Sequence, residues 1–320
     1  MRVISGQSVL ITGGTGSFGS AFVQHVLAMQ PGPSRVCILS RDELKQAEMR
    51  VTLADDHRLR WFVGDVRDLP RLEMAFHGID AVIHAAAMKR VDACEYDPFE
   101  AVKTNILGTE NVIAAALKNE VKRVLLLSSD KACAPKNLYG ATKACAEKLI
   151  LAANSYRGRG ATRFSAVRYG NVAGARGSVI PTWRAAVSGG LPLPVMEADA
   201  TRFWFTLDQA VDLVLWTLDD MQGGELVVPK LPSFRLVDLA EAMAPGWPRA
   251  YSGHRDGDKK HESMISADES VYFRAYSGRF VRFPNGQMRG SPLPPGFAFC
   301  SDQNDVWLDV AALRVALKQV

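Results

Sequence analysis

Residues 8–20 read SVLITGGTGSFGS: a short apolar run, a glycine-rich turn and the start of a helical pattern. Glycine is needed where the backbone turns tightly or approaches a pyrophosphate, and the helix N-terminus behind the turn supplies free N–H groups. The spacing Gly13-x-x-Gly16-x-x-Gly19 alone also fits an ordinary turn, but its place between a first strand and a first helix predicts dinucleotide binding. The expected contacts are Thr12, Gly13, Thr15, Gly16, Ser17, Phe18 and Gly19.

Short apolar runs and helical patterns alternate through the first half of the chain. The strand-like runs are 8–12, 35–39, 59–63, 81–84, 123–128 and 163–169, and helical patterns include 17–29, 98–119 and 139–156. Continuous apolar strands separated by helices are typical of a parallel sheet covered on both faces. The repeated order therefore predicts an α/β, Rossmann-like, doubly wound fold.

The rhythm changes after Tyr169, where loops rich in Gly and Pro precede a helix at 206–221 that begins with a capping box. We expect a dinucleotide-binding domain at 1–170, to which 206–230 returns. A smaller substrate lobe is expected from 171–205 and 231–300, followed by a C-terminal helix within 301–320.

Composition excludes several classes of protein. The 320 residues are 48% hydrophobic and carry a net charge of +4 without a basic run, so nothing favours binding to nucleic acid or to a membrane surface. No apolar run approaches the ~18 residues of a membrane span, and no signal-peptide pattern is present. Five cysteines without a CxxC pair and histidines without metal-ligand spacing predict a reduced, cytoplasmic protein without a metal.

The residues after the second strand bear on the choice of cofactor. Ser40 and Arg41 come first, where an acidic residue would favour NAD, and an arginine there accommodates a 2′-phosphate. With Lys45 on the next turn, NADP is favoured over NAD, although Asp42 also reads as a plain helix N-cap. Further contacts are expected after strands three and four, from Asp65, Val66, Ala85, Ala86 and Ala87.

Residues 128–143, SSDKACAPKNLYGATK, concentrate acid–base side chains. Tyr139 and Lys143 lie four apart at the start of a helix, so both point from one face. A free tyrosine has a pKa near ~10, and a cation one turn away lowers it. In another sequence context such a pair would be read as two surface residues. Here it follows a dinucleotide loop, so the Tyr139–Lys143 pair predicts proton removal from a hydroxyl while hydride leaves for a nicotinamide.

A series of blocks from residue 12 to about 304 carries a resemblance to a known family. They are TGGTGSFGS, SRDELKQ, GDVRD, HAAAMKRV, EYDPFEAVKTNILGTENV, SSDKAC, NLYGATK, RYGNV, GSVIP, TRFW, DGDKKHESMIS and GFAFCSDQN. The chain resembles the extended short-chain dehydrogenase/reductases and, within them, the inverting UDP-N-acetylglucosamine 4,6-dehydratases. The resemblance adds Asn105 to the expected cofactor contacts.

Asp130 and Lys131 go beyond what redox chemistry or epimerisation at sugar C4 requires. A 4,6-dehydratase needs a base for the C5 proton and an acid for the departing 6-hydroxyl. The resemblance implies Lys131 as the inverting C5 base, Asp130 as the acid and Ser129, more often threonine in the family, as the hydroxyl near O4. A neighbouring carboxylate raises a lysine's pKa, whereas a base must be neutral, and a plain loop ion pair is the alternative.

The second lobe should hold a nucleotide diphosphate, for which arginine offers a bidentate fork. By resemblance the substrate contacts are Lys89, Asn171, Ser178, Val179, Arg202, Arg255 and Asp258, the last being glutamate in most of the family. His261 and Glu262 are expected to stabilise the lobe and not to catalyse.

The function implied is an NADP-dependent, C5-inverting 4,6-dehydratase acting on UDP-N-acetylglucosamine, an entry point to pseudaminic-acid-type surface glycans. A homo-oligomer is also implied. A C5-retaining dehydratase or an epimerase on another nucleotide sugar is the close alternative. A non-catalytic NADP-binding regulator is the remote one, since such proteins typically lose the Tyr/Lys pair that this chain retains.

Overall fold

A ten-stranded sheet forms the centre of the computed structural model, which describes residues 2–158, 160–253, 257–284, 286–287 and 289–320. Its order is β15-β13-β14-β9-β6-β5-β4-β1-β2-β3. The parallel strands are β1 (Ser8–Thr12), β2 (Arg35–Ser40), β3 (Leu59–Val63), β4 (Ala81–His84), β5 (Arg123–Leu127), β6 (Arg163–Val167) and β9 (Leu226–Pro229). Val9, Leu10 and Ile11 are fully buried in the middle of the sheet, as the apolar run predicts.

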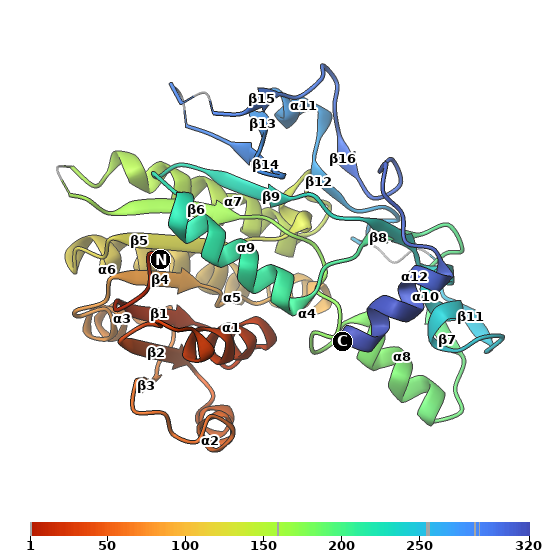
Figure 1. Ribbon diagram of the computed structural model, residues 1–320, viewed down its shortest axis with the longest axis horizontal. Helices are drawn as coiled ribbons and strands as arrows, with labels where there is room; N and C mark the ends of the chain where they lie inside the picture. Colours follow the sequence, from red (N-terminus) through yellow and green to blue (C-terminus); the bar gives the residue numbers. More distant parts are fainter. Residues whose placement is uncertain (1, 159, 254–256, 285, 288) are drawn as a thin grey trace.

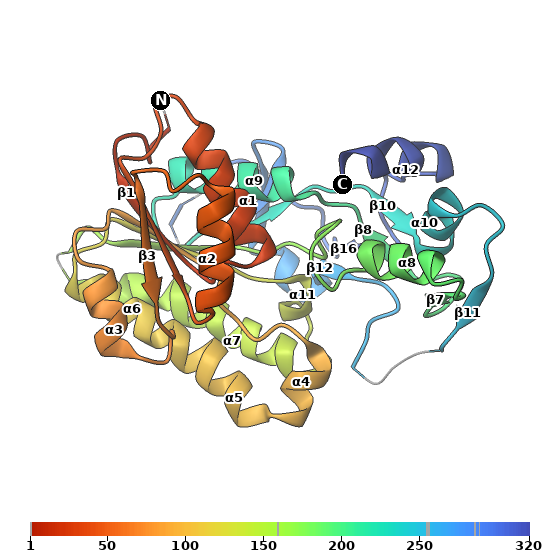
Figure 2. The ribbon, with the colours of Figure 1, turned by 90° about the horizontal axis from the view of Figure 1, so that it is seen from below.

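Helices cover both faces of this sheet (Figure 2). One layer contains α1 (Ser17–Ala28), α2 (Glu43–Thr52) and α9 (Leu207–Asp220); the other contains α3 (Leu69–Ala75), α5 (Pro98–Val102), α6 (Gly108–Lys118) and α7 (Leu138–Ala152), with α4 (Val91–Tyr96) at its end. The predicted doubly wound, Rossmann-like fold is confirmed. Within the described part of the chain, no helix has the length and apolarity to cross a membrane.

The helix predicted over 98–119 is interrupted by a π-helical turn, η1 (Lys103–Leu107), between α5 and α6. The apolar periodicity continues through the turn, so the π-helical turn could not be predicted from the pattern. Such turns are frequent at functional sites because they re-aim one side chain. Here Asn105 is buried in the turn and contacts the backbone of Met88.

A smaller lobe lies beside the sheet, at the right of Figure 1. Its elements are α8 (Val179–Ser188), β7 (Leu193–Val195), β8 (Thr201–Phe203), β10 (Ser233–Arg235), α10 (Leu236–Met243), β11 (Arg249–Tyr251) and α12 (Val310–Ala316). Trp183, Phe234, Leu239 and Leu313 are buried in one apolar cluster, so the C-terminal helix packs into this lobe. That helix begins after the Asp309 cap, within the predicted range 301–320.

Part of the segment 231–300 lies on the large sheet and not in the second lobe. Strands β13 (Phe273–Tyr276), β14 (Arg279–Arg282) and β15 (Ser291–Pro292) extend the sheet in antiparallel fashion. Phe280 and Val281 of β14 are buried and pair with Val228 and Val227 of β9. Burial of these apolar side chains on the sheet edge explains the difference from the predicted division.

A buried ion cluster joins the sheet to the segment that follows the second lobe. Arg168, just after β6, pairs through two hydrogen bonds of 3.0 and 2.7 Å with Glu147 of α7. The same guanidinium binds Glu269 of α11 (Ala267–Ser270) at 2.6 Å and the carbonyl of Met264 in β12 (Ser263–Ile265) at 2.8 Å. A guanidinium suits such a junction because its N–H donors can bind two carboxylates at the same time.

We expect Arg168→Met to lower the free energy of unfolding by about 3–5 kcal/mol, because the buried Glu147 and the half-buried Glu269 lose their partner. Arg90→Ala is the matched control, since the Arg90–Asp92 pair is exposed on both sides and is expected to contribute far less. Equilibrium urea unfolding measures both. Equal losses in the two variants would contradict the assigned role of the cluster.

Candidate active site

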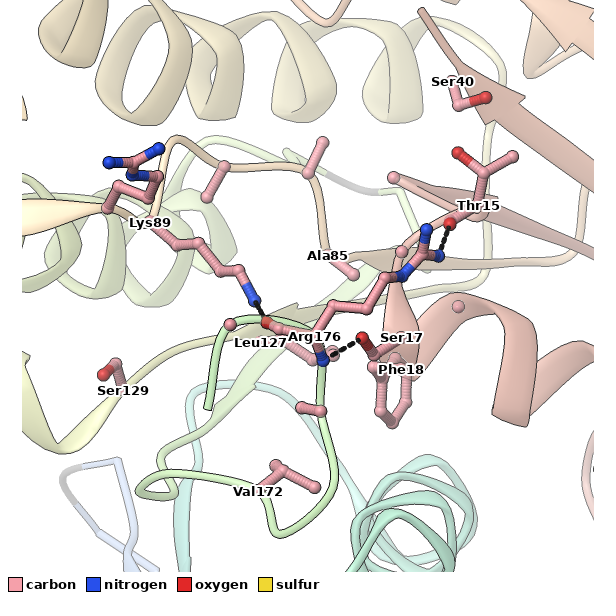
Figure 3. Close-up of a pocket in the computed structure, with 18 of the residues that line it drawn as sticks. Thr15, Ser17, Phe18, Ser40, Ala85, Lys89, Leu127, Ser129, Val172 and Arg176 are labelled. Atoms are coloured by element: carbon pink, nitrogen blue, oxygen red, sulfur yellow. Dashed lines mark hydrogen bonds between the residues drawn. The ribbon is translucent and has the colours of Figure 1, made fainter. Parts of the chain in front are cut away.

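The carboxyl ends of the parallel strands open into a cavity of about 1230 Å³ that reaches the second lobe. Figure 3 shows side chains from the glycine loop, from β4 and β5 and from residues 172–176 converging on it. The predicted residues that line it are Gly13, Thr15, Gly16, Ser17, Phe18, Gly19, Ser40, Arg41, Lys45, Asp65, Val66, Ala85, Ala86, Ala87, Lys89, Ser129, Lys131, Tyr139, Lys143, Asn171, Ser178 and Val179. Ligands of α/β sheets bind at this edge.

The glycine loop has the shape that a dinucleotide requires. Gly13 has φ +67°, and a Cβ there would lie 2.9 Å from the backbone of Ala86. At Gly14 a Cβ would lie 2.7 Å from a side-chain carbon of Ile38. Helix α1 begins at Ser17, and its N-cap residue Gly16 has no side chain to cap it. The first N–H groups of the helix are therefore left for an anion. These residues fit a nicotinamide dinucleotide.

Two of the predicted cofactor residues lie beneath the cavity wall and do not line it. The Thr12 hydroxyl lies 2.8 Å from His84 Nδ1 and accepts a hydrogen bond from the Ala86 N–H. Asn105 holds both backbone groups of Met88 and donates to Thr142 at 2.9 Å. Both side chains therefore support the loop that follows β4.

At the end of β2, Arg41 reaches the cavity rim with 60% of its side chain exposed. Its nearest carboxylate oxygen belongs to Asp65 at 3.9 Å, and Asp65 is already paired with Arg67 at 2.7 Å. Lys45 instead pairs with Asp42 at 2.7 Å. Of the two cations at this rim, Arg41 therefore has a weaker ion pair than Lys45.

Tyr139 and Lys143 lie one turn apart on α7 and are both buried. The Lys143 ammonium donates to the carbonyl of Leu127 at 2.6 Å. Burial lowers the pKa of Lys143 to about 8, although Glu147 acts in the opposite direction. Burial raises the pKa of Tyr139, which outweighs the lowering by the Ser129 hydroxyl and by Lys131. The lowering of the tyrosine pKa predicted from Lys143 is therefore not found, because the ring is desolvated.

Asp130 and Lys131 form the short 3₁₀ turn η2 (Asp130–Ala132) after β5. The Lys131 Nζ lies 3.2 Å from Asp130 Oδ1, 3.4 Å from Asn171 Oδ1 and 3.3 Å from Glu262 Oε1. Ser129 donates to Asp130 Oδ1 at 2.8 Å. The predicted acid–base pair is thus a cluster in which one ammonium lies between two carboxylates.

Charge and burial shift the pKa values within this cluster in different directions. Burial and the Glu262 carboxylate raise the pKa of Asp130. Burial alone would lower the pKa of Lys131, but the two carboxylates hold it above its ordinary value. Burial likewise opposes ionisation of Glu262, but Lys131 and Arg202 keep its pKa below its ordinary value. Lys131 is therefore protonated at rest, whereas a base must be neutral, as the neighbouring carboxylate in the sequence predicts.

The remaining predicted substrate residues are less uniformly placed. Arg202 of β8 donates to the carbonyls of Thr201 and Lys260 and lies 3.5 Å from Glu262, behind the cavity wall. Asp258 is half-buried and does not line the cavity. Arg255 lies outside the described residues.

Sequence reasoning missed Arg176 and underrated Glu262. The N–H of Arg176 donates to the Ser17 hydroxyl at 3.0 Å, and its guanidinium donates to the Thr15 carbonyl at 2.7 Å (Figure 3). Its carbonyl accepts from Lys89. The signal available was an arginine within a glycine-rich loop, AGARGS, which is a common form for phosphate contacts.

The model of one family, described as polysaccharide biosynthesis protein, matches residues 9–282. A protein of Campylobacter jejuni subsp. jejuni serotype O:23/36 named UDP-N-acetylglucosamine 4,6-dehydratase (inverting) is 43% identical over 95% of each chain. A Rickettsia rickettsii protein named UDP-glucose 4-epimerase is 40% identical over 82% of this chain and 79% of its own. The solved structure titled Pen from Bacillus thuringiensis is 36% identical, covers 99% of both chains and has a TM-score of 0.91.

These matches extend over the sheet, the cavity and most of the second lobe, and they confirm the resemblance read from the motifs. The chain belongs to the polysaccharide biosynthesis protein family and has the extended short-chain dehydrogenase/reductase fold.

Proposed function

We propose that this protein is an NADP-dependent UDP-N-acetylglucosamine 4,6-dehydratase that inverts C5. The observation that carries the proposal is the Asp130–Lys131 pair: Lys131 lines the cavity together with Tyr139, and Asp130, buried behind the cavity wall, lies 3.2 Å from the Lys131 ammonium. An acid and a base beside a Tyr/Lys pair suit elimination, which C4 redox chemistry alone does not need. The inverting Campylobacter relative covers nearly the whole chain and supports this choice.

A nicotinamide cofactor bound at the glycine loop would take a hydride from C4 and return it to C6. The Lys143 ammonium would stabilise Tyr139 as the phenolate, which takes the proton of the 4-hydroxyl and becomes a neutral phenol. Ser129 lies next to Asp130, within reach of the same part of the sugar. The new 4-ketone acidifies the C5 proton.

The cluster supplies both forms that the elimination requires. Transfer of one proton from Lys131 Nζ to Asp130 Oδ1 gives a neutral amine and a carboxylic acid. The raised pKa of Asp130 favours this transfer, and the raised pKa of Lys131 opposes it. The amine then takes the C5 proton, the C6–O bond breaks, and the proton of Asp130 leaves with the 6-hydroxyl as water. Lys131 afterwards returns a proton to C5. The proton that Tyr139 gains balances the one that Asp130 loses.

We propose that three arginines contact the phosphates of the cofactor and of the substrate. Arg176 lies against the glycine loop and Arg41 at the ribose end of the same cavity. Arg202, near the cluster, is proposed to contact the substrate diphosphate by resemblance. A guanidinium at each place matches phosphate oxygens in a bidentate way. The cytoplasmic location, the homo-oligomeric state and the pseudaminic-acid-type pathway stay predictions.

The first test is proton NMR of the purified protein with UDP-N-acetylglucosamine in deuterated water. We expect a new 6-methyl signal, deuterium at C5 and coupling constants of the L-arabino 4-keto sugar, because Lys131 exchanges its protons with solvent. The D-xylo pattern would indicate retention and contradict the role of Lys131. Formation of the C4 epimer alone would favour the epimerase alternative.

Tyr139→Phe should lower kcat by roughly 100-fold or more, because it removes the group that accepts the 4-hydroxyl proton. Binding of NADP, followed by fluorescence titration, should be retained. Tyr156→Phe serves as the control, since Tyr156 is exposed beyond the end of α7. Full activity in the Tyr139 variant would contradict the role of Tyr139 as the acceptor of the 4-hydroxyl proton.

Arg41→Ala should weaken NADP binding by roughly 10- to 100-fold and affect NAD far less, because only the 2′-phosphate loses a charged partner. Arg50→Ala on α2 is a control of equal charge, and Arg50 pairs with Asp55 outside the cavity. Isothermal titration with each cofactor measures the change. An equal loss for NAD and NADP would refute the assigned selectivity.

A further inference from the structure

Glu262 lies directly behind Lys131, just before β12, and only 3% of it is exposed. It does not line the cavity. Its Oε1 lies 3.3 Å from Lys131 Nζ and 3.5 Å from Arg202 Nε, and its N–H donates to the Ser301 hydroxyl at 2.9 Å. Glu262 therefore touches Lys131 of the elimination pair without lining the cavity itself.

The pairing of Glu262 differs from that of a carboxylate whose role is structural. Both oxygens of Glu147 accept hydrogen bonds from Arg168. By contrast, Glu262 Oε2 is buried without a hydrogen-bond partner among the described residues. An unsatisfied buried carboxylate oxygen is costly. A residue kept for stability alone would be expected to satisfy both oxygens.

We propose that Glu262 is a positioning residue for the elimination: it holds the Lys131 amine against Asp130 and sets the pH range in which these two groups share a single proton. The inference rests on the proposed function, because it assigns Lys131 and Asp130 their roles in removing the C5 proton and the 6-hydroxyl.

The sign of the effect follows from the charges around the cluster. The titratable and charged groups that face it from the packed elements are Asp130 and Lys131 of η2, Tyr139 of α7, Arg202 of β8, and Lys259 and Glu262 of the segment before β12. The Glu262 carboxylate raises the pKa of both Asp130 and Lys131. Removing its charge lowers both values, so the form with one shared proton exists at lower pH.

Glu262→Gln tests the inference with kcat measured against pH and UDP-N-acetylglucosamine as substrate. We expect the acid limb of the pH profile to move to lower pH, because Asp130 loses a carboxylate that raises its pKa. We expect the plateau value of kcat to fall by roughly tenfold or more, because Lys131 loses the group that holds it against Asp130. KM should change little, since Glu262 does not reach the cavity. Glu262→Asp keeps the charge at a greater distance from Lys131. Its pH profile should lie between those of the unmodified protein and Glu262→Gln.

Glu225→Gln is the matched control. Glu225 is equally buried but binds Ser165 and the turn before β9, outside the cavity. Its profile should coincide with that of the unmodified protein even where its thermal stability falls.

An unchanged pH profile in Glu262→Gln, with lost stability alone, would overturn the inference and leave the dehydratase intact. If the glutamine variant does not fold, an unchanged profile in Glu262→Asp would have the same meaning. Failure of the unmodified protein to place deuterium at C5 would instead refute the proposed function, and the inference with it.

Discussion

A charge buried where two parts of a chain meet has to be paired, and this requirement determines how the active site is assembled. Arg168 binds Glu147 on one side and Glu269 on the other. Lys131 is held in the same way between Asp130 and Glu262, which lies 131 positions further along the chain. Removing either partner leaves an uncompensated charge. Both clusters fix the segment that precedes and follows β12 against the carboxyl ends of β5 and β6.

The parts of the fold that follow from local pattern were predictable. The strands at 8–12 and 81–84 have the predicted bounds, because a strand buried on both faces is apolar throughout. The half-exposed edge strand at 59–63 also has the predicted bounds. The edge of the sheet where the site lies also follows from the order of strands and helices. The π turn at 103–107 did not follow, since its insertion leaves the apolar spacing of the helix nearly unchanged.

What sequence reasoning missed depends on pairing between distant segments. Nothing near β14 indicates that its Val281 will lie beside Val227 at the edge of the large sheet. Glu262 stands in a stretch of charged residues, KKHES, that reads as a surface. Its burial arises because Lys131 and Arg202 converge on it from two other elements. Arg176 similarly acquires its place only when residues 172–178 fold back over the glycine loop.

Two lysines of one site illustrate why residue type alone does not fix a chemical role. Lys143 is buried beside the Leu127 carbonyl, and desolvation lowers its pKa to about 8. Lys131 is also buried, but two carboxylates overcome desolvation and raise its pKa. Lys143 therefore changes charge near neutral pH in the protein alone, and a phenolate or phosphate nearby would favour its charged form. In the proposed mechanism Lys131 becomes a base only by passing its proton to Asp130, so the carboxylate that raises the pKa of the lysine is also the group that receives its proton.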